Sequence, residues 1–445
     1  MKVIRFSYLV FLTILIFCFS LGVYGEEEVS EDGGGKVKEW KLPGQGAGPI
    51  VVNPYDGSLW LCLHQTWNLV AIDGSGGSVI LNVPFNLKKR EEHHLDSSGM
   101  RIPRVPLEIT PTSLGFTSDG SVGFIVGEPL SEGSIATGVV QVFDPKTGEK
   151  IGELEVEGAC NAVFVEGKED VYIACGMQYG YPGLVYKLRW DGVGKSLKVM
   201  GRAETGKIPW ALTVYEGNLY VTDLELQWTA QADGSMGPPY GAWVWVYDAG
   251  TLEFKNKVWV GINPSVLVRI PQGVLVGCSG SKQTEGRYEP ALVYLRGPEA
   301  SESEYVFIGS AGASDVAASA DGRCVLVSLA DFAPAPPFSQ IAQWSELLRG
   351  AVPEARRWVY TGKMALIDVS RLSEDVEEGD GEGGNEYVPE AIEVVRGGHI
   401  RRVAMSSDGS VVYALVVNDA SGEEMLISFP FDVLLEGKPL ISFEQ

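Results

Sequence analysis

Short runs of alternating apolar and polar residues recur along the chain, and tight-turn sequences separate them. The clearest example is the stretch 109–158, in which Asp119-Gly120 separates two such runs. Alternation with a period of two is typical of half-buried β-strands, and Asp-Gly between two runs is a hairpin signal. The pattern predicts four antiparallel strands at Thr112–Thr117, Val122–Gly127, Val139–Asp144 and Lys150–Val156.

This four-stranded unit recurs through the chain. A single unit would leave apolar faces uncovered, so copies must pack against one another. The first hairpins of the copies begin at Pro49, Pro111, Cys160, Pro209, Pro264, Ser314 and Arg401. Helical periodicity is nearly absent, the period is too regular for a β-sandwich, and it is too long for a solenoid. We therefore predict an all-β, seven-bladed β-propeller of four-stranded blades over residues 36–445.

A propeller needs its last blade completed so that no sheet edge stays open. Val37–Leu42 and Leu440–Phe443 are both candidate strands near the junction, and the sequence leaves the choice open. The first strand of each blade is expected to line the channel. Its apolar side chains are then expected to be buried between blades, namely Val51, Leu114, Val163, Leu212, Val266 and Val403.

The N-terminus has the pattern of an export signal. Residues 1–25 contain a basic start, a long apolar run and a small residue at the end. Residues 26–35 are acidic and glycine-rich, which is typical of a disordered leader. An uncleaved membrane anchor is the alternative, because the apolar run is long. We expect a secreted, periplasmic or cell-surface protein that is not inserted in the membrane after signal cleavage.

The charge balance narrows the choice of partners. The chain has 35 basic and 58 acidic residues, for a formal net charge of −23. A field of this sign repels nucleic acid and anionic lipid and favours cationic partners. Nucleic-acid binding is therefore not expected.

The long connections are expected on one face. Strand direction alternates within a blade, so second-to-third loops and interblade segments share a face. The second-to-third loops are long and contain aromatic and polar residues suited to binding a protein, a peptide or a glycan. A short helix is predicted over 339–350. The candidate ligand-binding residues are Trp67, Gln178, Tyr179, Tyr181, Trp228, Tyr240, Arg287, Tyr288, Trp344 and His399.

Two stretches resemble the YVTN-type β-propeller repeat: LYVTD at 219–223 followed by VWVYDAGTLEF at 244–254, and GVVQVFDPKTGEKIGELEVEG at 138–158. The resemblance covers most of the mature chain, although most copies lack the signature asparagine. It implies the propeller fold. Members of this superfamily include surface proteins, binding proteins and lactonase-like enzymes. By repeat position, the channel-mouth residues of such an enzyme would be His64, Asn161, Asp223, Asp315 and Arg401.

No motif for a cofactor or a metal is present. The adjacent His93 and His94 do not have the spacing of a metal site. The leading hypothesis is an exported, non-enzymatic propeller that binds its partner through the loop-rich face. The alternatives are a lactonase-like hydrolase and a subunit of a periplasmic or cell-surface complex.

The cysteines give one further prediction, because disulfides persist in exported proteins. Counting outward from the turn at Gly167-Lys168, Val165 faces Asp170 and Cys160 faces Cys175. We predict a Cys160–Cys175 disulfide, with the remaining cysteines of the mature chain reduced. The alternative is that all of them are small buried apolar residues.

Overall fold

We analysed a computed structural model of the chain, which divides into residues Met1–Gly35 and Lys36–Gln445. All described residues belong to the second part. They are 37–42, 47–63, 68–72, 79–84, 90–91, 106–107, 109–129, 137–177, 181–224, 242–280, 291–309, 311–319, 321–334, 356–372 and 389–443.

Seven four-stranded antiparallel sheets form the blades. Blade one contains β2 (Ala47–Val52), β3 (Leu59–Leu63), β4 (Asn68–Ile72) and β5 (Val79–Pro84). Blade two contains β8 (Ile109–Phe116), β9 (Gly123–Pro129), β10 (Thr137–Phe143) and β11 (Lys150–Glu157). Blade three contains β12 (Ala159–Glu166), β13 (Asp170–Gly176), β14 (Gly183–Asp191) and β15 (Ser196–Thr205). Blade four contains β16 (Pro209–Tyr215), β17 (Asn218–Asp223), β18 (Ala242–Asp248) and β19 (Phe254–Val260).

Blade five contains β20 (Ile262–Ile270), β21 (Gly273–Gly280), β22 (Leu292–Arg296) and β23 (Glu302–Val306). Blade six contains β24 (Gly312–Ala318), β25 (Cys324–Pro334), β26 (Arg356–Asp368) and β27 (Ala391–Glu393). Blade seven contains β29 (Gly398–Met405), β30 (Val411–Asn418), β31 (Glu424–Pro430) and, from the other end of the propeller, β1 (Lys38–Lys41). A small sheet of β6 (Arg90–Glu91) and β7 (Pro106–Leu107) lies between blades one and two in the chain.

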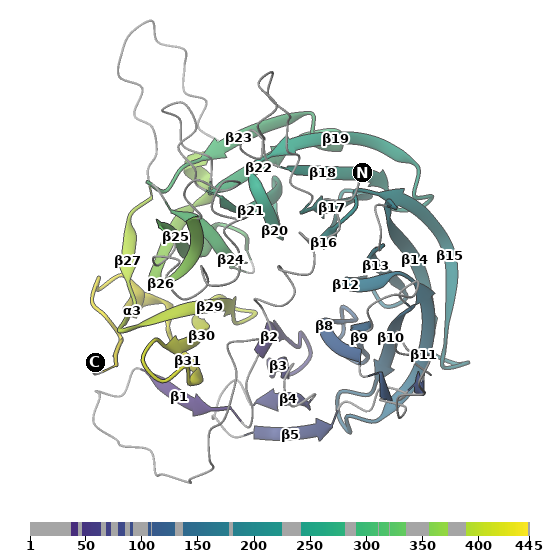
Figure 1. The fold of residues 1–445 in the computed structure, drawn as a ribbon, viewed down its shortest axis with the longest axis horizontal. Helices are drawn as coiled ribbons and strands as arrows, with labels where there is room; N and C mark the ends of the chain where they lie inside the picture. The colour runs from purple at the N-terminus through teal and green to yellow at the C-terminus, as the bar shows by residue number, and fades with distance from the viewer. Residues whose placement is uncertain are drawn as a thin grey trace, which may run out of the picture. The chain divides into compact units, whose positions relative to one another are not determined.

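The innermost strands close into a ring. Each packs against the next in the order β2, β8, β12, β16, β20, β24, β29 and back to β2. Figure 1 shows these strands around the centre, with the later strands of each blade outside them. The predicted seven-bladed β-propeller is therefore confirmed.

The N-terminal strand completes the last blade. β1 pairs antiparallel with β31, so that Trp40 lies opposite Leu426. The C-terminal strand β32 (Ile441–Ser442) instead pairs in parallel with β28 (Val395–Arg396), in the connection between blades six and seven. In the chain, α3 (Phe431–Leu434) follows β31 and precedes β32, so it leads the chain away from the end of blade seven. This resolves the choice that the sequence left open.

The core consists of apolar clusters between neighbouring blades. Of the inner-strand residues expected there, Leu114, Val163, Leu212 and Val403 are buried, as predicted. Val51 and Val266 are only partly buried, although both pack against a core cluster.

Three first-to-second turns share one hydrogen-bond network. They are TSDGSV at 117–122, SADGRC at 319–324 and SSDGSV at 406–411. In each, the initial hydroxyl donates to the Asp carboxylate and accepts the N–H five residues later. The glycine has positive φ, for example 72° at Gly409, which favours a residue without Cβ. The repeat therefore specifies its own hairpin.

The two faces of the propeller differ in their connections. We call the face of these short turns the turn face, and the opposite one, where second strands end and third strands begin, the loop face. Turns of neighbouring blades contact each other on the turn face: Ser118 N–H donates to the Gly167 carbonyl at 2.7 Å. At the loop face β17 ends at Asp223 and β18 begins at Ala242, β21 ends at Gly280 and β22 begins at Leu292, and β25 ends at Pro334 and β26 begins at Arg356.

The turn carboxylates give a pH prediction. Hydrogen bonds, chiefly from the Ser406 hydroxyl, lower the pKa of Asp408 from 3.8 to about 2. Because the folded pKa lies below the unfolded one, the ionised carboxylate stabilises the fold above pH of about 4, and this contribution disappears toward pH 2. Asp408→Asn should therefore have a lower melting temperature than the parent at pH 6, and the two should converge near pH 2. A difference that is constant across this range would contradict the assignment.

Candidate binding face

Every inner strand contains a β-bulge near its loop-face end. The register with the second strand shifts by one residue in all seven blades. Bulges turn side chains away from the regular ladder and are often found beside functional sites. The bulge positions of blades two to seven, which we call the bulge ring, hold Thr112, Asn161, Trp210, Ser265, Ser314 and Arg401.

One of these bulges corrects a predicted register. In blade three Val165 lies opposite Val171, one residue away from the expected Asp170. The extra residue, Asn161, then shifts the register back, so that Cys160 does lie opposite Cys175. The predicted juxtaposition is thus correct, although its counting omitted the bulge.

The polar bulge residues of blades two and three each bond to the following blade. The Thr112 hydroxyl donates to the Cys160 carbonyl at 2.7 Å. One blade further on, the Asn161 amide donates to the Pro209 carbonyl at 2.8 Å. Cys160 and Pro209 hold the same repeat position, directly before their own bulges. These side chains therefore satisfy backbone groups across the blade junction.

Asp315 makes a similar link between blades six and seven. Its carboxylate accepts the N–H of Val316 and, across the junction, the N–H of Val403, both at 3.0 Å. Burial raises the pKa of Asp315, against the opposing effect of Arg402 and these hydrogen bonds. The neighbouring bulge residue, Arg401, pairs with the buried carboxylate of Glu424.

The channel-mouth residues suggested by the family resemblance do not form one cluster. Asp223 is buried and accepts the N–H of Ile208 at 3.0 Å, beside the carbonyl that Asn161 contacts. Asn161 and Asp223 therefore meet between blades three and four, whereas Asp315 and Arg401 lie between blades six and seven. His64 lies outside the described residues. The described members hold backbone groups or ion pairs.

Exposed aromatic side chains gather at the loop-face ends of the strands. They are Tyr181, Trp210, Tyr305 and Tyr360, exposed by 64%, 41%, 41% and 39%, and they come from blades three to six. On the turn face the corresponding residues are Tyr55 and Phe254, exposed by 68% and 52%. Aromatic residues with exposed apolar area are favoured at protein interfaces.

Tyr360 forms part of a polar–aromatic group on blades six and seven. Its ring stacks on His399, with centroids 5.5 Å apart and an interplanar angle of 14°. The Nδ1 atom of His399 lies 2.6 Å from a carboxylate oxygen of the exposed Asp419. Two blades therefore present one fixed imidazole–phenol stack at the loop face.

Of the predicted ligand-binding residues, the structure describes Tyr181 and His399, both at the loop face. The others lie outside the described residues, as does the helix predicted over 339–350; the list is Trp67, Gln178, Tyr179, Trp228, Tyr240, Arg287, Tyr288 and Trp344.

Sequence reasoning missed Trp210, Tyr305 and Tyr360. The sequence did contain a signal for Trp210. The same repeat position holds the polar residues Thr112, Asn161 and Ser265 in other blades, and a tryptophan departs from that pattern.

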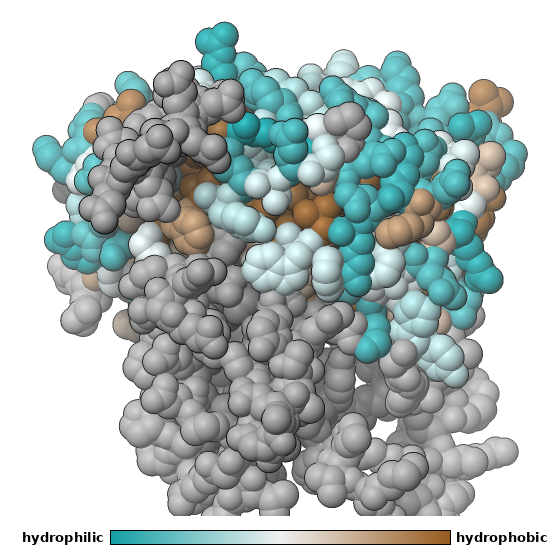
Figure 2. Space-filling model, turned by 90° about the horizontal axis from the view of Figure 1, so that it is seen from above, coloured by the Kyte–Doolittle hydropathy of each residue, from teal (hydrophilic) through white to brown (hydrophobic). Residues whose placement is uncertain are grey.

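The outer edge of blade four has a cation–aromatic cluster. The ammonium of Lys257 lies 4.3 Å from the ring centroid of Trp243 and 4.5 Å from that of Trp245. Beside it, Trp259 contacts Tyr305 of blade five, with centroids 6.3 Å apart. Figure 2 looks at the edge of the propeller that contains β19 and β23, where hydrophobic and near-neutral residues lie among hydrophilic ones. This cluster extends the aromatic surface outward from the loop face.

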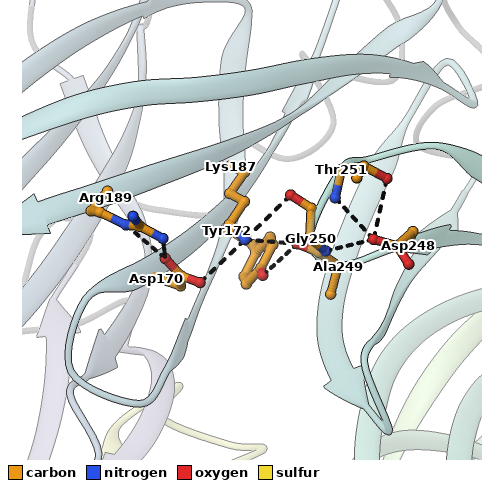
Figure 3. Close-up of polar contacts among 8 residues, drawn as sticks. All are labelled: Asp170, Tyr172, Lys187, Arg189, Asp248, Ala249, Gly250 and Thr251. Carbon is orange, nitrogen blue, oxygen red and sulfur yellow. Dashed lines mark hydrogen bonds and ion pairs between the residues drawn. The ribbon is translucent and has the colours of Figure 1, made fainter.

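A buried lysine on the turn face has a structural role (Figure 3). Lys187 of blade three donates to the Ala249 and Gly250 carbonyls of blade four, at 3.0 and 3.4 Å. It also pairs with Asp170 at 3.2 Å, and the Tyr172 hydroxyl donates to the same Ala249 carbonyl at 2.7 Å. Since the ammonium is surrounded by oxygen acceptors, Lys187 joins two blades.

The described residues contain no group of three or more His, Cys, Asp or Glu side chains placed to hold a metal ion. No helix within this part of the chain is long and apolar enough to cross a membrane.

Comparison with solved structures identifies the fold alone. A chain of the mitotic checkpoint complex is similar over 93% of this chain and 98% of that one, with 9% identity and a TM-score of 0.52. The β-propeller domain of Cps50 (Swd1) from Myceliophteria thermophila (9% identity, 88% and 99% coverage) has a TM-score of 0.48. Sqt1 of Saccharomyces cerevisiae (10% identity, 87% and 86% coverage) has a TM-score of 0.47.

No protein-family model and no curated protein matches the chain. The protein is a seven-bladed β-propeller. The comparisons do not single out the YVTN type: the structural neighbours are propellers of the WD40 type.

The contacts of Lys187 predict a stability difference. Lys187→Met removes charged hydrogen bonds to the blade-four turn, which should lower the free energy of unfolding by about 2–3 kcal/mol. Arg189→Met is the matched control, because Arg189 pairs with the same Asp170 but its side chain is half exposed. It should cost less than about 1 kcal/mol. Denaturant unfolding measures both, and equal losses would contradict the proposed link between the blades.

Proposed function

We propose that this chain is an exported binding protein that recognises a protein or peptide partner through its loop face. The observation that carries the proposal is the placement of Tyr181, Trp210, Tyr305 and Tyr360 at the loop-face ends of four consecutive blades. Large aromatic side chains of this kind provide much of the binding energy at protein interfaces.

The use of polar groups in the ring supports a scaffold role. Asn161, Asp223 and Asp315 bind backbone groups at blade junctions, so these polar side chains hold neighbouring blades together. One similar solved chain belongs to a multiprotein complex. With a net charge of −23, the protein favours a partner that carries positive charge. No observation on the described residues favours the hydrolase alternative.

Export is part of this proposal, and it rests on the signal-like pattern of residues 1–25. We expect the mature chain to begin at Glu26. The test is the intact mass of the protein recovered from outside the producing cell. A mass that includes the first 25 residues would contradict signal cleavage.

Four single substitutions test the binding face. Partners of the mature protein are captured from the producing organism by cross-linking and then quantified by mass spectrometry. Trp210→Ala and Tyr360→Ala should reduce recovery of a specific partner about tenfold or more, as expected for interface hot spots. Tyr55→Ala and Phe254→Ala remove aromatic rings of the turn face that are more exposed than Trp210 and Tyr360, and they should leave recovery unchanged.

Protein stability separates binding from folding in this experiment. Because all four side chains are more than a third exposed, each variant should lose no more than about 2 kcal/mol, including the ring contacts that Tyr360 makes with His399 and Phe254 makes with Trp245 and Tyr247. Equal loss of capture on both faces, or no loss on the loop face, would contradict the proposal. Loss of capture after enzymatic deglycosylation of the extract would assign recognition to a glycan instead.

A further inference from the structure

Cys160 and Cys175 form a closely opposed pair of thiols. They lie directly opposite each other on β12 and β13, and their sulfur atoms are 2.8 Å apart. Both side chains are fully buried in the cluster between blades two and three. In the structure both are thiols. Only a small closing movement would be needed to join the sulfurs.

The packing around the pair is close. A Cβ atom added at Gly138, on the third strand of blade two, would lie 2.3 Å from the Cys160 sulfur. Blade two therefore covers the pair once the two blades have packed. Burial, followed by the neighbouring Cys160, raises the pKa of the Cys175 thiol. In the folded protein, burial therefore disfavours the thiolate form of Cys175 and also hinders the approach of an oxidant.

We propose that Cys160 and Cys175 form a disulfide during folding of the exported chain, before blade two packs against blade three. One thiol loses its proton, attacks a small-molecule or protein disulfide, and displaces a thiolate to give a mixed disulfide. The second deprotonated cysteine then attacks its partner's sulfur and releases the other half of the oxidant as a thiolate. Two protons leave the cysteines, and two electrons pass to the oxidant.

The other cysteines supply internal controls. Cys62 and Cys278 are each buried, in core clusters away from blade three, and burial raises the pKa of Cys62 to about 12. Cys324 is partly exposed near the turn face. In the folded protein Cys324 should react with an alkylating reagent, whereas the reduced buried thiols should not.

Oxidative refolding tests the geometry without depending on export. The reduced, denatured mature protein is refolded with glutathione disulfide, unfolded again without reductant, alkylated and mapped. We expect alkylation at Cys62, Cys278 and Cys324 but not at Cys160 or Cys175. Full alkylation of both Cys160 and Cys175 would overturn the disulfide. The same mapping of exported protein tests oxidation in the natural compartment, so failure there alone would count against the proposed export.

The order of events needs a second measurement. Glutathione disulfide added to protein refolded in the reduced state should form the bond at least tenfold more slowly than during refolding, while Cys324 reacts readily. Equal rates would overturn the claim that the bond precedes blade packing. The double variant Cys160→Ser/Cys175→Ser has neither thiol, so it should refold without forming this bond. A disulfide found in it would join other cysteines and would be non-native.

Discussion

The fold depends on one backbone pairing between distant parts of the chain. β1 provides the outer strand of blade seven, whose other strands come from the C-terminal end of the propeller. An inner strand has a hydrogen-bonded partner within its blade on one edge only. A single blade also leaves apolar faces uncovered, so the seven blades are stable when each packs against the next around a closed ring. Trp40 and Leu42 are buried where β1 completes this ring.

The bulges add a second layer of order to the closed ring. Each inner strand carries one extra residue near the loop face, and two of these residues, Thr112 and Asn161, use their side chains to hold the next blade. Where the position holds Trp210, the same geometry exposes an aromatic ring. One backbone device thus provides both the joints between blades and part of the proposed binding surface.

The sequence predicted the repeat more reliably than the site. Turns such as SSDGSV at 406–411 contain their own hydrogen-bonding groups, so these hairpins of the repeat follow from local chemistry. The closing strand depends on where α3 directs the chain, which no local pattern contains. The bulge at Asn161 shifts the pairing register between β12 and β13, but the pattern of apolar and polar residues in the sequence is not interrupted there. Asp223 and Asp315 looked like reactive groups, but their backbone partners come from distant segments.

Removal of β1 tests this account most directly. Two truncated chains can be compared: one begins at Val37 and keeps β1, and the other begins at Pro43 and lacks it. The first should unfold like the parent in denaturant. The second should lose roughly 3–5 kcal/mol, from the burial of Trp40 and Leu42 and the paired backbone of β31, and should exchange the amide hydrogens of β31 faster. Equal stability of the two truncated chains would contradict closure of the ring by β1.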